Sequence, residues 1–143
     1  MATEVRFYVN LADRLGYACR LLRKAQGMGT QVVVTGDPQG LGALDQALWT
    51  FAPHDFVPHA MLGVAPPPVV ARSSIVLAVE PLATAHRALL VNLGGGVPEG
   101  FDQFARLFEL VSADTAELEA ARERWKHYKA KGHSVEKHDV LAS

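Results

Sequence analysis

Two spacings of apolar residues alternate along this chain, and each predicts a different kind of element. Continuous apolar runs of about four to eight residues are typical of strands covered on both faces of a parallel sheet. Such runs lie at 31–35, 74–79 and 88–93, and two further strands are expected at 5–9, which is rich in β-branched and aromatic residues, and at about 106–112. Between them, apolar residues recur every three or four positions, the spacing of a helix with one buried face, over 11–28, 38–50 and 115–131, with a brief helix near 100–105. This alternation predicts an α/β fold: a single Rossmann-like domain with a mostly parallel five-stranded sheet and helices on both faces.

The remaining segments contain few periodic residues. Gly132 ends the last helix, which begins with a capping-box-like sequence at 114–117. The Pro-rich segment 63–73 has no periodicity, so we interpret it as an internal linker. Residues 133–143 are interpreted as a C-terminal tail. We therefore expect one domain over 1–143, a length that supports a single core.

The stretch 44–59 begins as the end of an amphipathic helix and continues as an aromatic loop. Proline cannot continue a helix and also restricts the residue before it, so this loop is stiff. Its aromatic residues and prolines are Trp49, Phe51, Pro53, Phe56 and Pro58. They form either a small core under a long connection or a docking surface for another protein, since rigid, half-exposed aromatics are common anchors of interfaces.

The last helix concentrates positive charge around aromatic side chains. At 100° per residue, Trp125 lies on one stripe with Arg122 and Lys129, and Tyr128 lies on the neighbouring face. Six of the chain's fourteen lysines and arginines lie in or after this helix: Arg122, Arg124, Lys126, Lys129, Lys131 and Lys137. One interpretation is a site for an acidic peptide with an apolar end. The other is an apolar core stripe whose basic neighbours form a solvated rim near the helix C-terminus.

Composition excludes several classes of protein. A formal net charge of −1 gives no global field that would draw the molecule onto nucleic acid or an anionic membrane. The single cysteine, Cys19, excludes an internal disulfide, fits a reducing cytosol and is expected to be a small buried hydrophobic residue. No apolar run reaches the roughly 20 residues of a membrane helix. We expect a cytoplasmic protein with no membrane partner.

No motif predicts catalysis, a metal site or a cofactor. Gly36–Gly42 lies between a strand and a helix but lacks the Walker A and GxGxxG patterns, and Asp37 would repel a phosphate. Asn92–Pro98 follows a strand, but no lysine or arginine adjoins it in the sequence, which favours a turn with positive φ. His54 and His59 are too few for a zinc site, and we expect His59 to fix the aromatic loop by hydrogen bonds.

Several short segments, in a fixed order, are shared with one known family. They are Phe7-Tyr8, 44–49 leading to 56–59, 91–93, and 121–129 running to Gly132. Each segment alone is weak evidence of a relationship, but the combination and order of the segments are specific and cover nearly the whole chain. On these residues the chain resembles the chi subunit of bacterial DNA polymerase III holoenzyme. The resemblance implies a Rossmann-like α/β fold, no catalytic site of its own, and an accessory role in DNA replication.

The resemblance also implies two docking surfaces. The first binds the psi subunit, which tethers chi to the clamp loader, and its expected residues here are Trp49, Phe51, Phe56 and Pro58. The second binds the acidic C-terminal tail of single-stranded DNA-binding protein, which ends in proline and phenylalanine. Its expected residues are Arg122, Trp125, Lys126, Tyr128, Lys129 and Gly132. DNA would then be reached only indirectly, by avidity for many tails on one coated strand.

The chain departs from the family pattern near the second surface. Leu118 stands where the family has a lysine, Trp125 where a tyrosine is common, and His133 where an aromatic is frequent. A weaker or more salt-sensitive tail interaction is expected, because exposed charges are screened. Two alternatives stay open: a small Rossmann-type nucleotide-binding protein or enzyme that uses the loops after the second and fourth strands, or an interaction domain whose aromatic loop dimerises.

Overall fold

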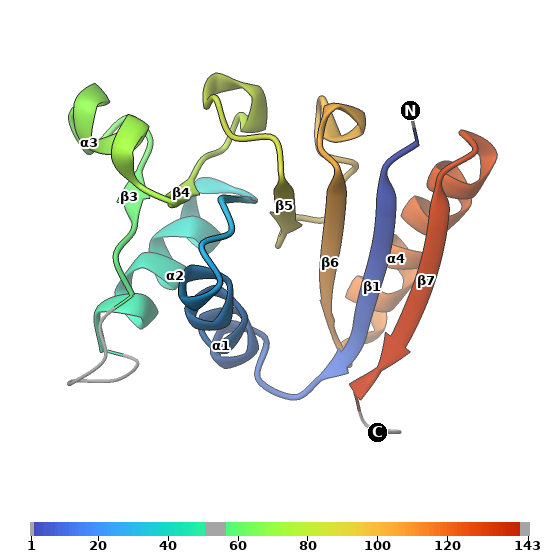
Figure 1. Ribbon diagram of the computed structural model, residues 1–143. Helices are drawn as coiled ribbons and strands as arrows, with labels where there is room; N and C mark the ends of the chain where they lie inside the picture. The colour runs from blue at the N-terminus through green and yellow to red at the C-terminus, as the bar shows by residue number, and fades with distance from the viewer. Residues whose placement is uncertain (1, 51–56, 141–143) are drawn as a thin grey trace.

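Seven parallel strands form one sheet across the molecule (Figure 1). The computed structural model describes residues 2–50 and 57–140. The order across the sheet is β3-β4-β2-β5-β6-β1-β7, and every pairing is parallel. The strands are β1 (Glu4–Leu11), β2 (Val32–Thr35), β3 (Ala60–Met61), β4 (Ile75–Leu77), β5 (Leu89–Asn92), β6 (Arg106–Ser112) and β7 (Ser134–Asp139).

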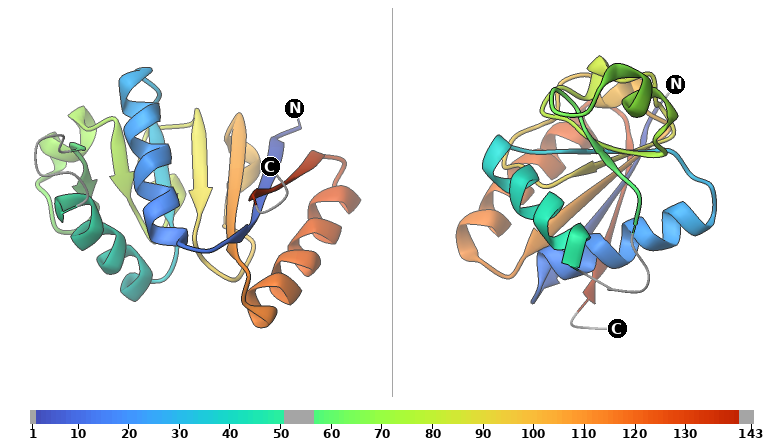
Figure 2. Two further views of the ribbon diagram at one scale, coloured as in Figure 1. Left: turned by 90° about the horizontal axis from the view of Figure 1, so that it is seen from below. Right: turned by 90° about the vertical axis from the view of Figure 1, so that its left-hand side faces the viewer.

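Helices cover both faces of the sheet, as predicted. They are α1 (Arg14–Gly27), α2 (Pro38–Thr50), α3 (Pro67–Arg72) and α4 (Thr115–Ala130), with 3-10 turns η1 (Pro81–Ala83) and η2 (Phe101–Gln103). Figure 2 shows α1 and α4 on opposite sides of the strands. We call these sides the α1 face, where α2 also packs, and the α4 face. Each has its own hydrophobic core cluster, the first centred on α1 and α2 and the second on α4.

The amino-acid pattern of each strand reflects whether the strand is buried on one face of the sheet or on both. The central strands β2 and β5 are buried at every position, which explains their continuous apolar runs. Along β1, burial instead alternates: Val5, Phe7 and Val9 are buried in the α4-face core, while the residues between them are not. At β1 and β7, on the right in Figure 1, the sheet is therefore fully covered on one face only, whereas the neighbouring β6 is buried on both.

The sequence-based count of five strands was too low. The two missed strands, β3 and β7, are the edges of the sheet. β3 has two residues, and β7 has only Val135 buried, so neither gives the apolar run of a central strand. Consequently 133–143 is not simply a tail, because its first part forms an ordered strand beside β1.

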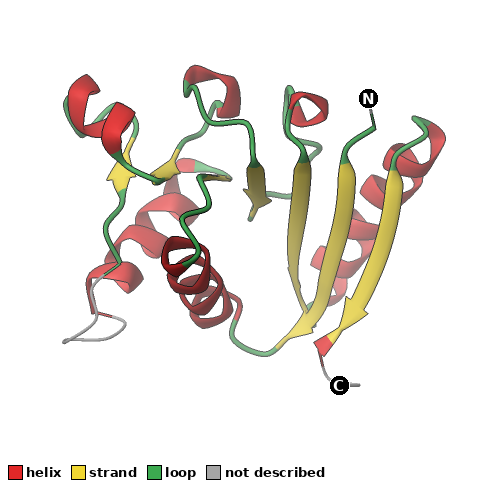
Figure 3. Ribbon diagram, in the orientation of Figure 1, coloured by secondary structure: helices red, strands yellow, loops and turns green. Residues whose placement is uncertain are grey.

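The segment 63–73 is also more ordered than the linker interpretation allowed. Its second half forms helix α3, which is drawn as a red coil in Figure 3. Pro66 precedes the helix in extended geometry and Pro67 occupies its first position, where the missing N–H costs nothing. Val70 of α3 is buried in the α4-face core, so this proline-rich run is part of the packed domain.

Three local predictions can be compared with the structure directly. Cys19 is buried, as expected, and burial raises the pKa of its thiol. His59 holds its loop as expected, with Nδ1 2.8 Å from the Val57 carbonyl oxygen and Nε2 2.7 Å from Asp45 Oδ1. The positive φ expected in Asn92–Pro98 was wrong. A Cβ on Gly94 would come within 3.4 Å of Gly36 Cα, so close packing of two loops favours glycine there instead.

No described helix is both long and apolar enough to cross a membrane.

Candidate functional site

A pocket of about 500 Å³ lies between α4 and strands β1 and β7. We call it the α4 pocket. Three elements contribute its walls, and the residues share an apolar floor with charged groups at the rim. They are Phe7, Val9, Asn10, Leu118, Ala121, Arg122, Trp125, Lys126, Lys137 and Asp139.

The apolar floor follows from side-chain size on α4. Ala121 is buried against the sheet but too small to fill the space over β1. One turn on, the half-buried Trp125 packs its ring 5.3 Å from the ring of Phe7, at a tilted angle of 50°. Aromatic pairs at this separation are favourable. A small residue beside two large ones therefore leaves an apolar hollow that is open to solvent.

Positive charge surrounds this hollow. Arg122, Lys126 and Lys137 line it from α4 and β7, and Lys129 Nζ lies 5.8 Å from the centroid of the Trp125 ring. That separation is within the range of a cation–π contact. Lys126 also lies 3.4 Å from Glu123, but both side chains are about three-quarters exposed at 73% and 75%, so the pair is weak.

One carboxylate, Asp139, also lines the pocket. Asn10 Nδ2 donates a hydrogen bond of 2.9 Å to Asp139 Oδ2, which ties β7 to the end of β1. The three cations outnumber this single carboxylate, so the rim is positive. An apolar hollow with a positive rim can hold an apolar group attached to an anionic chain.

Four of the six residues predicted for this surface come together there. Arg122, Trp125 and Lys126 line the pocket, and Lys129 contacts the Trp125 ring. Tyr128 is not available to a ligand at that surface, because it is fully buried on the neighbouring side of α4.

The sixth residue, Gly132, is not among the residues that line the pocket. It follows the last turn of α4 with φ +86°, a left-handed conformation that favours glycine. Its place in the structure is that of the helix C-terminal cap.

Tyr128 belongs to a buried polar network beneath α4. Its hydroxyl donates to Glu109 Oε2 at 2.5 Å, and Asn92 Nδ2 donates to Glu109 Oε1 at 2.9 Å. Arg124 Nη2 lies 3.1 Å from Glu109 Oε1, and its Nη1 donates to the Gly95 carbonyl at 2.8 Å. Burial raises the pKa of Glu109, and Arg124 opposes that rise by stabilising the carboxylate. Burial and the nearby Glu109 also raise the pKa of Tyr128.

This network was not predicted from the sequence. A single polar residue within a predicted strand does not reveal whether its side chain has a buried partner. Glu109 stands between Phe108 and Leu110 in β6, where the period-two alternation places it under α4. Arg124 was grouped with the other cations in and after the last helix, but it is buried. The paired Glu109 and Arg124 fix how α4 sits on the sheet, and thus the shape of the α4 pocket.

The second predicted surface lies at the C-terminal end of α2. Trp49 is 62% exposed, and its ring lies 5.8 Å from the His59 ring in an edge-on arrangement. Pro58, the residue before His59, is also exposed. Phe51 and Phe56 lie outside the described residues. The described part therefore presents an exposed tryptophan held next to a hydrogen-bonded histidine, which suits an interface anchor.

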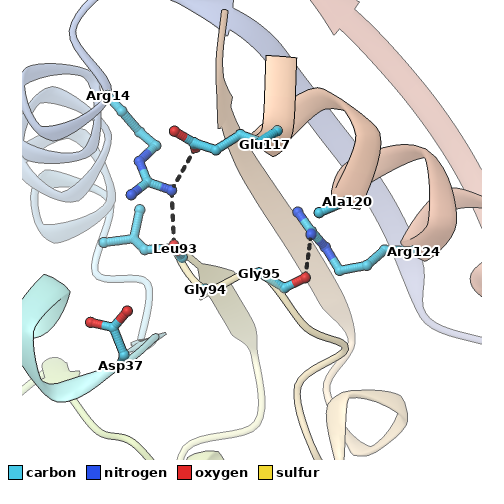
Figure 4. A pocket seen from close by; sticks show the side chains of 9 residues that line it. Arg14, Asp37, Leu93, Gly94, Gly95, Glu117, Ala120 and Arg124 are labelled. Atoms are coloured by element: carbon cyan, nitrogen blue, oxygen red, sulfur yellow. Dashed lines mark hydrogen bonds and ion pairs between the residues drawn. The ribbon is translucent and has the colours of Figure 1, made fainter. Parts of the chain in front are cut away.

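A second hollow, of about 340 Å³, lies at the edge of the sheet where the strands end (Figure 4). Doubly wound folds bind ligands at such edges. It brings together Asp37 after β2 and Gly94 and Gly95 after β5, the two loops of the nucleotide alternative. Contrary to the sequence-based view, arginines do stand beside these glycines, namely Arg14 and Arg124.

Both arginines at this edge already have acceptors within the protein. Arg14 Nη1 donates to the Leu93 carbonyl at 2.8 Å and lies 3.1 Å from Glu117, as Figure 4 shows. Arg124 is held by Gly95 and Glu109. With Glu117 and Asp37 on the walls, the arrangement does not favour a phosphate. Among residues 2–50 and 57–140, no three metal-ligating side chains gather at one point.

The α4 pocket contains residues that sequence reasoning missed. Lys137 was assigned to the tail, Phe7 and Val9 were assigned to a strand but not to this surface, and Asn10 was given no role. The alternation along β1 places Phe7 and Val9 on the α4 face, and parallel pairing of Phe7 with Lys137 brings the cation beside it. The strand alternation could have predicted the first contact, but the pairing depends on β7, which was not recognised.

Comparison with known proteins gives consistent matches over most of the chain. Residues 2–136 match the family described as DNA polymerase III chi subunit, HolC. The DNA polymerase III subunit chi of Pseudomonas aeruginosa is 33% identical over 141 residues, covering 95% of this chain and 96% of that relative. The DNA polymerase III subunit chi of Haemophilus influenzae is 27% identical over 127 residues, covering 86% of this chain and 85% of that relative.

Proposed function

This chain belongs to the family of DNA polymerase III chi subunits, and we propose that it links the clamp loader to single-stranded DNA-binding protein during replication. In this proposal it is a non-catalytic accessory subunit. The psi subunit binds at the α2 end, and the acidic tail of single-stranded DNA-binding protein binds in the α4 pocket.

The observation that carries the proposal is the α4 pocket itself. A peptide that ends in phenylalanine has an aromatic ring and a terminal carboxylate on neighbouring atoms, with further carboxylates upstream. The apolar floor at Phe7 and Trp125 suits the ring, and the cations Arg122, Lys126 and Lys137 suit the carboxylates. Burying one aromatic side chain stabilises a complex by roughly 1.5–3 kcal/mol. The pocket thus matches both parts of such a tail.

The second contact is proposed from exposure and position. Trp49 stands at the end of α2, on an element that does not border the α4 pocket. Separate surfaces would let both partners bind at once, as a linking subunit requires. An exposed tryptophan of this kind buries a large area when a partner covers it.

The tail contact is tested by titrating the protein with a fluorescent acidic peptide that ends in Pro-Phe. Saturable binding is expected for the natural chain and a loss of about tenfold or more for Arg122→Ala and for Trp125→Ala, since each removes a pocket contact worth about 1.4 kcal/mol or more. Arg72→Ala, an exposed cation on α3, is the matched control and should bind normally. A peptide without the terminal phenylalanine should bind weakly.

Absence of binding by the folded natural chain would overturn the tail assignment. Equal losses of peptide affinity in Arg72→Ala and Arg122→Ala would also count against it. They would show that the peptide responds to positive charge anywhere on the surface and not to this pocket.

The psi contact is tested separately by co-purification with psi. Trp49→Ala is expected to lose psi while keeping the acidic peptide, and Trp125→Ala should do the reverse. If Trp49→Ala still retains psi at natural levels, the α2 surface is not the psi site.

A further inference from the structure

Part of the α1 face of the sheet, over β1 and β7, is left without a helix. In Figure 1, α4 lies behind β6, β1 and β7. On the other side α1 packs against β6, where Phe108 and Leu110 are buried, so no described helix covers β1 and β7 on that side. Burial agrees: along β1 the positions on this side are exposed or half-buried, whereas the opposite positions are buried. We call this area the open sheet face. It is distinct from the α4 pocket, which lies on the other side of the same strands.

Register places its side chains in rows across the three strands. Arg6 pairs with Phe108 and Glu136, and Tyr8 pairs with Leu110 and His138. In the row before them, Glu4 pairs with Arg106 and Ser134. Neighbouring strands are about 4.8 Å apart, so the β1 and β7 members of each row lie beside one another, and the rows of Arg6 and Tyr8 end at the buried Phe108 and Leu110 of β6.

Helix α1 forms a wall along this face. Tyr17, Arg20 and Lys24 follow one stripe of the helix, because they are three and four residues apart. The Tyr17 ring lies 5.6 Å from the Tyr8 ring on β1, and Arg20 lies 5.8 Å from the Tyr17 ring. The open sheet face is therefore a shallow surface with one aromatic and basic side.

Aromatic rings and guanidinium groups alternate across this face around the buried ring of Phe108. Tyr8 lies 5.3 Å from Phe108 and 5.7 Å from His138, centroid to centroid. Arg6 and Arg106 lie 5.8 and 5.5 Å from the Phe108 ring. Three of the cation–π pairs among the described residues lie on this one face.

Local charge differs in sign from that of the whole chain. The face and its wall carry four cations (Arg6, Arg20, Lys24 and Arg106) and two carboxylates (Glu4 and Glu136), a net charge of +2, whereas the chain as a whole carries −1. Arg6 lies 3.8 Å from Glu4 and 3.6 Å from Glu136, and these exposed pairs are weak enough for another anion to replace.

We propose that the open sheet face binds single-stranded nucleic acid. Single strands are held by rings and guanidinium planes on which bases stack, together with cations that follow the phosphates. Tyr8, Tyr17 and His138 supply ring surface, and Arg20 and Arg106 supply exposed cations on either side of it. An acidic peptide would use the cations but has no bases to stack. This direct contact adds to the indirect one expected from sequence and does not depend on the tail site.

The test uses fluorescence anisotropy with a labelled oligo(dT) and with an abasic strand of equal length. The two strands carry the same phosphates, so a difference isolates stacking. At low salt, oligo(dT) is expected to bind roughly tenfold or more tightly than the abasic strand. The logarithm of its binding constant should fall with the logarithm of salt concentration by about 0.7 for each phosphate neutralised.

Charge reversal identifies the face. Arg20→Glu with Arg106→Glu, both exposed, should weaken oligo(dT) binding by roughly tenfold or more and leave the acidic Pro-Phe peptide unaffected. The matched control is Arg72→Glu with Arg122→Glu, which changes the net charge by the same amount. It should bind oligo(dT) with unchanged affinity but should no longer bind the acidic Pro-Phe peptide. Circular dichroism confirms that both variants are folded.

Three results would overturn the proposal: no binding of oligo(dT) by the natural chain at low salt, equal affinity for the abasic strand, or equal weakening in both double variants. Displacement of oligo(dT) by a glutamate peptide as readily as by unlabelled oligo(dT) would also overturn it, because the face would then be a site for acidic protein.

Discussion

At the scale of single residues, α4 gives neighbouring cations opposite roles. Arg122 is exposed at the rim of the α4 pocket, whereas Arg124, two positions later, is buried against Glu109. The difference follows from helical geometry, since two residues are separated by about 200° around the axis. Sequence alone grouped the two arginines, because their charge is identical and only the direction of the side chain separates them.

Removing the buried arginine should therefore cost far more than removing the exposed one. Arg124→Met leaves Glu109 as an unpaired buried carboxylate, and the expected loss of unfolding free energy is about 3–5 kcal/mol. Arg122→Met should change it by no more than about 0.5 kcal/mol. Urea denaturation followed by circular dichroism measures both. Adding Glu109→Gln to Arg124→Met should restore part of the loss, and no recovery would argue against an unpaired charge as its cause.

Salt sensitivity is the residue-scale prediction for the tail contact. Leu118 contributes an apolar wall to the pocket, at the position where the sequence resemblance led us to expect a lysine. His133 accepts a hydrogen bond of 2.9 Å from the Thr3 amide at Nδ1 and packs its ring 5.0 Å from Phe101, so it serves the fold. The remaining cations are exposed and screened by salt. Affinity for the acidic peptide should fall steadily as salt rises, and a titration that shows no loss would refute this.

At the scale of elements, the start and end of α4 were predictable because the sequence contains capping residues at both. Asp114 accepts from the Glu117 amide at 3.1 Å, as the capping-box sequence predicted, and Gly132 follows the last turn. The central strands were predictable for a similar reason, because burial on both faces forces an apolar run. β7 was not, since an edge strand with one buried residue has no pattern of its own and depends on β1 for its pairing.

Gly132→Ala tests whether the cap conformation is required. A Cβ there would meet nothing within 4 Å, so any cost comes from φ +86° alone and should be about 1–2 kcal/mol. Gly27→Ala is the matched control, since Gly27 also meets nothing within 4 Å but lies in α1 without a positive φ, and it should be neutral or slightly stabilising. The difference in urea midpoints reports the result. Equal midpoints would contradict a left-handed cap at Gly132.

At the scale of the whole molecule, the two faces of the parallel sheet and its strand-end edge carry different surfaces. The α4 pocket uses the α4 face of β1 and β7, and the open sheet face uses the other side of the same strands. The pocket at the strand ends contains arginines, but they are bound to the protein's own acceptors. Sequence predicted the class of fold and the basic helix. It did not predict this division, because strand order places segments together that are far apart in the chain.

β7 is the element that both surfaces share, so its removal is the strongest test of the architecture. A chain that ends after Lys131 loses Val135 from the α4-face core, exposes the edge of β1, and removes Lys137 from the pocket. Burial of one valine side chain is worth roughly 1.5–3 kcal/mol, so the unfolding free energy should drop by at least about 1.5 kcal/mol. A chain that ends after Val140 keeps all of β7 and is the matched control. Were the two chains to unfold at the same urea concentration, residues 132–140 would be a dispensable tail after all. If the shorter chain were instead stable but could not bind the acidic peptide, β7 would serve the pocket without supporting the fold.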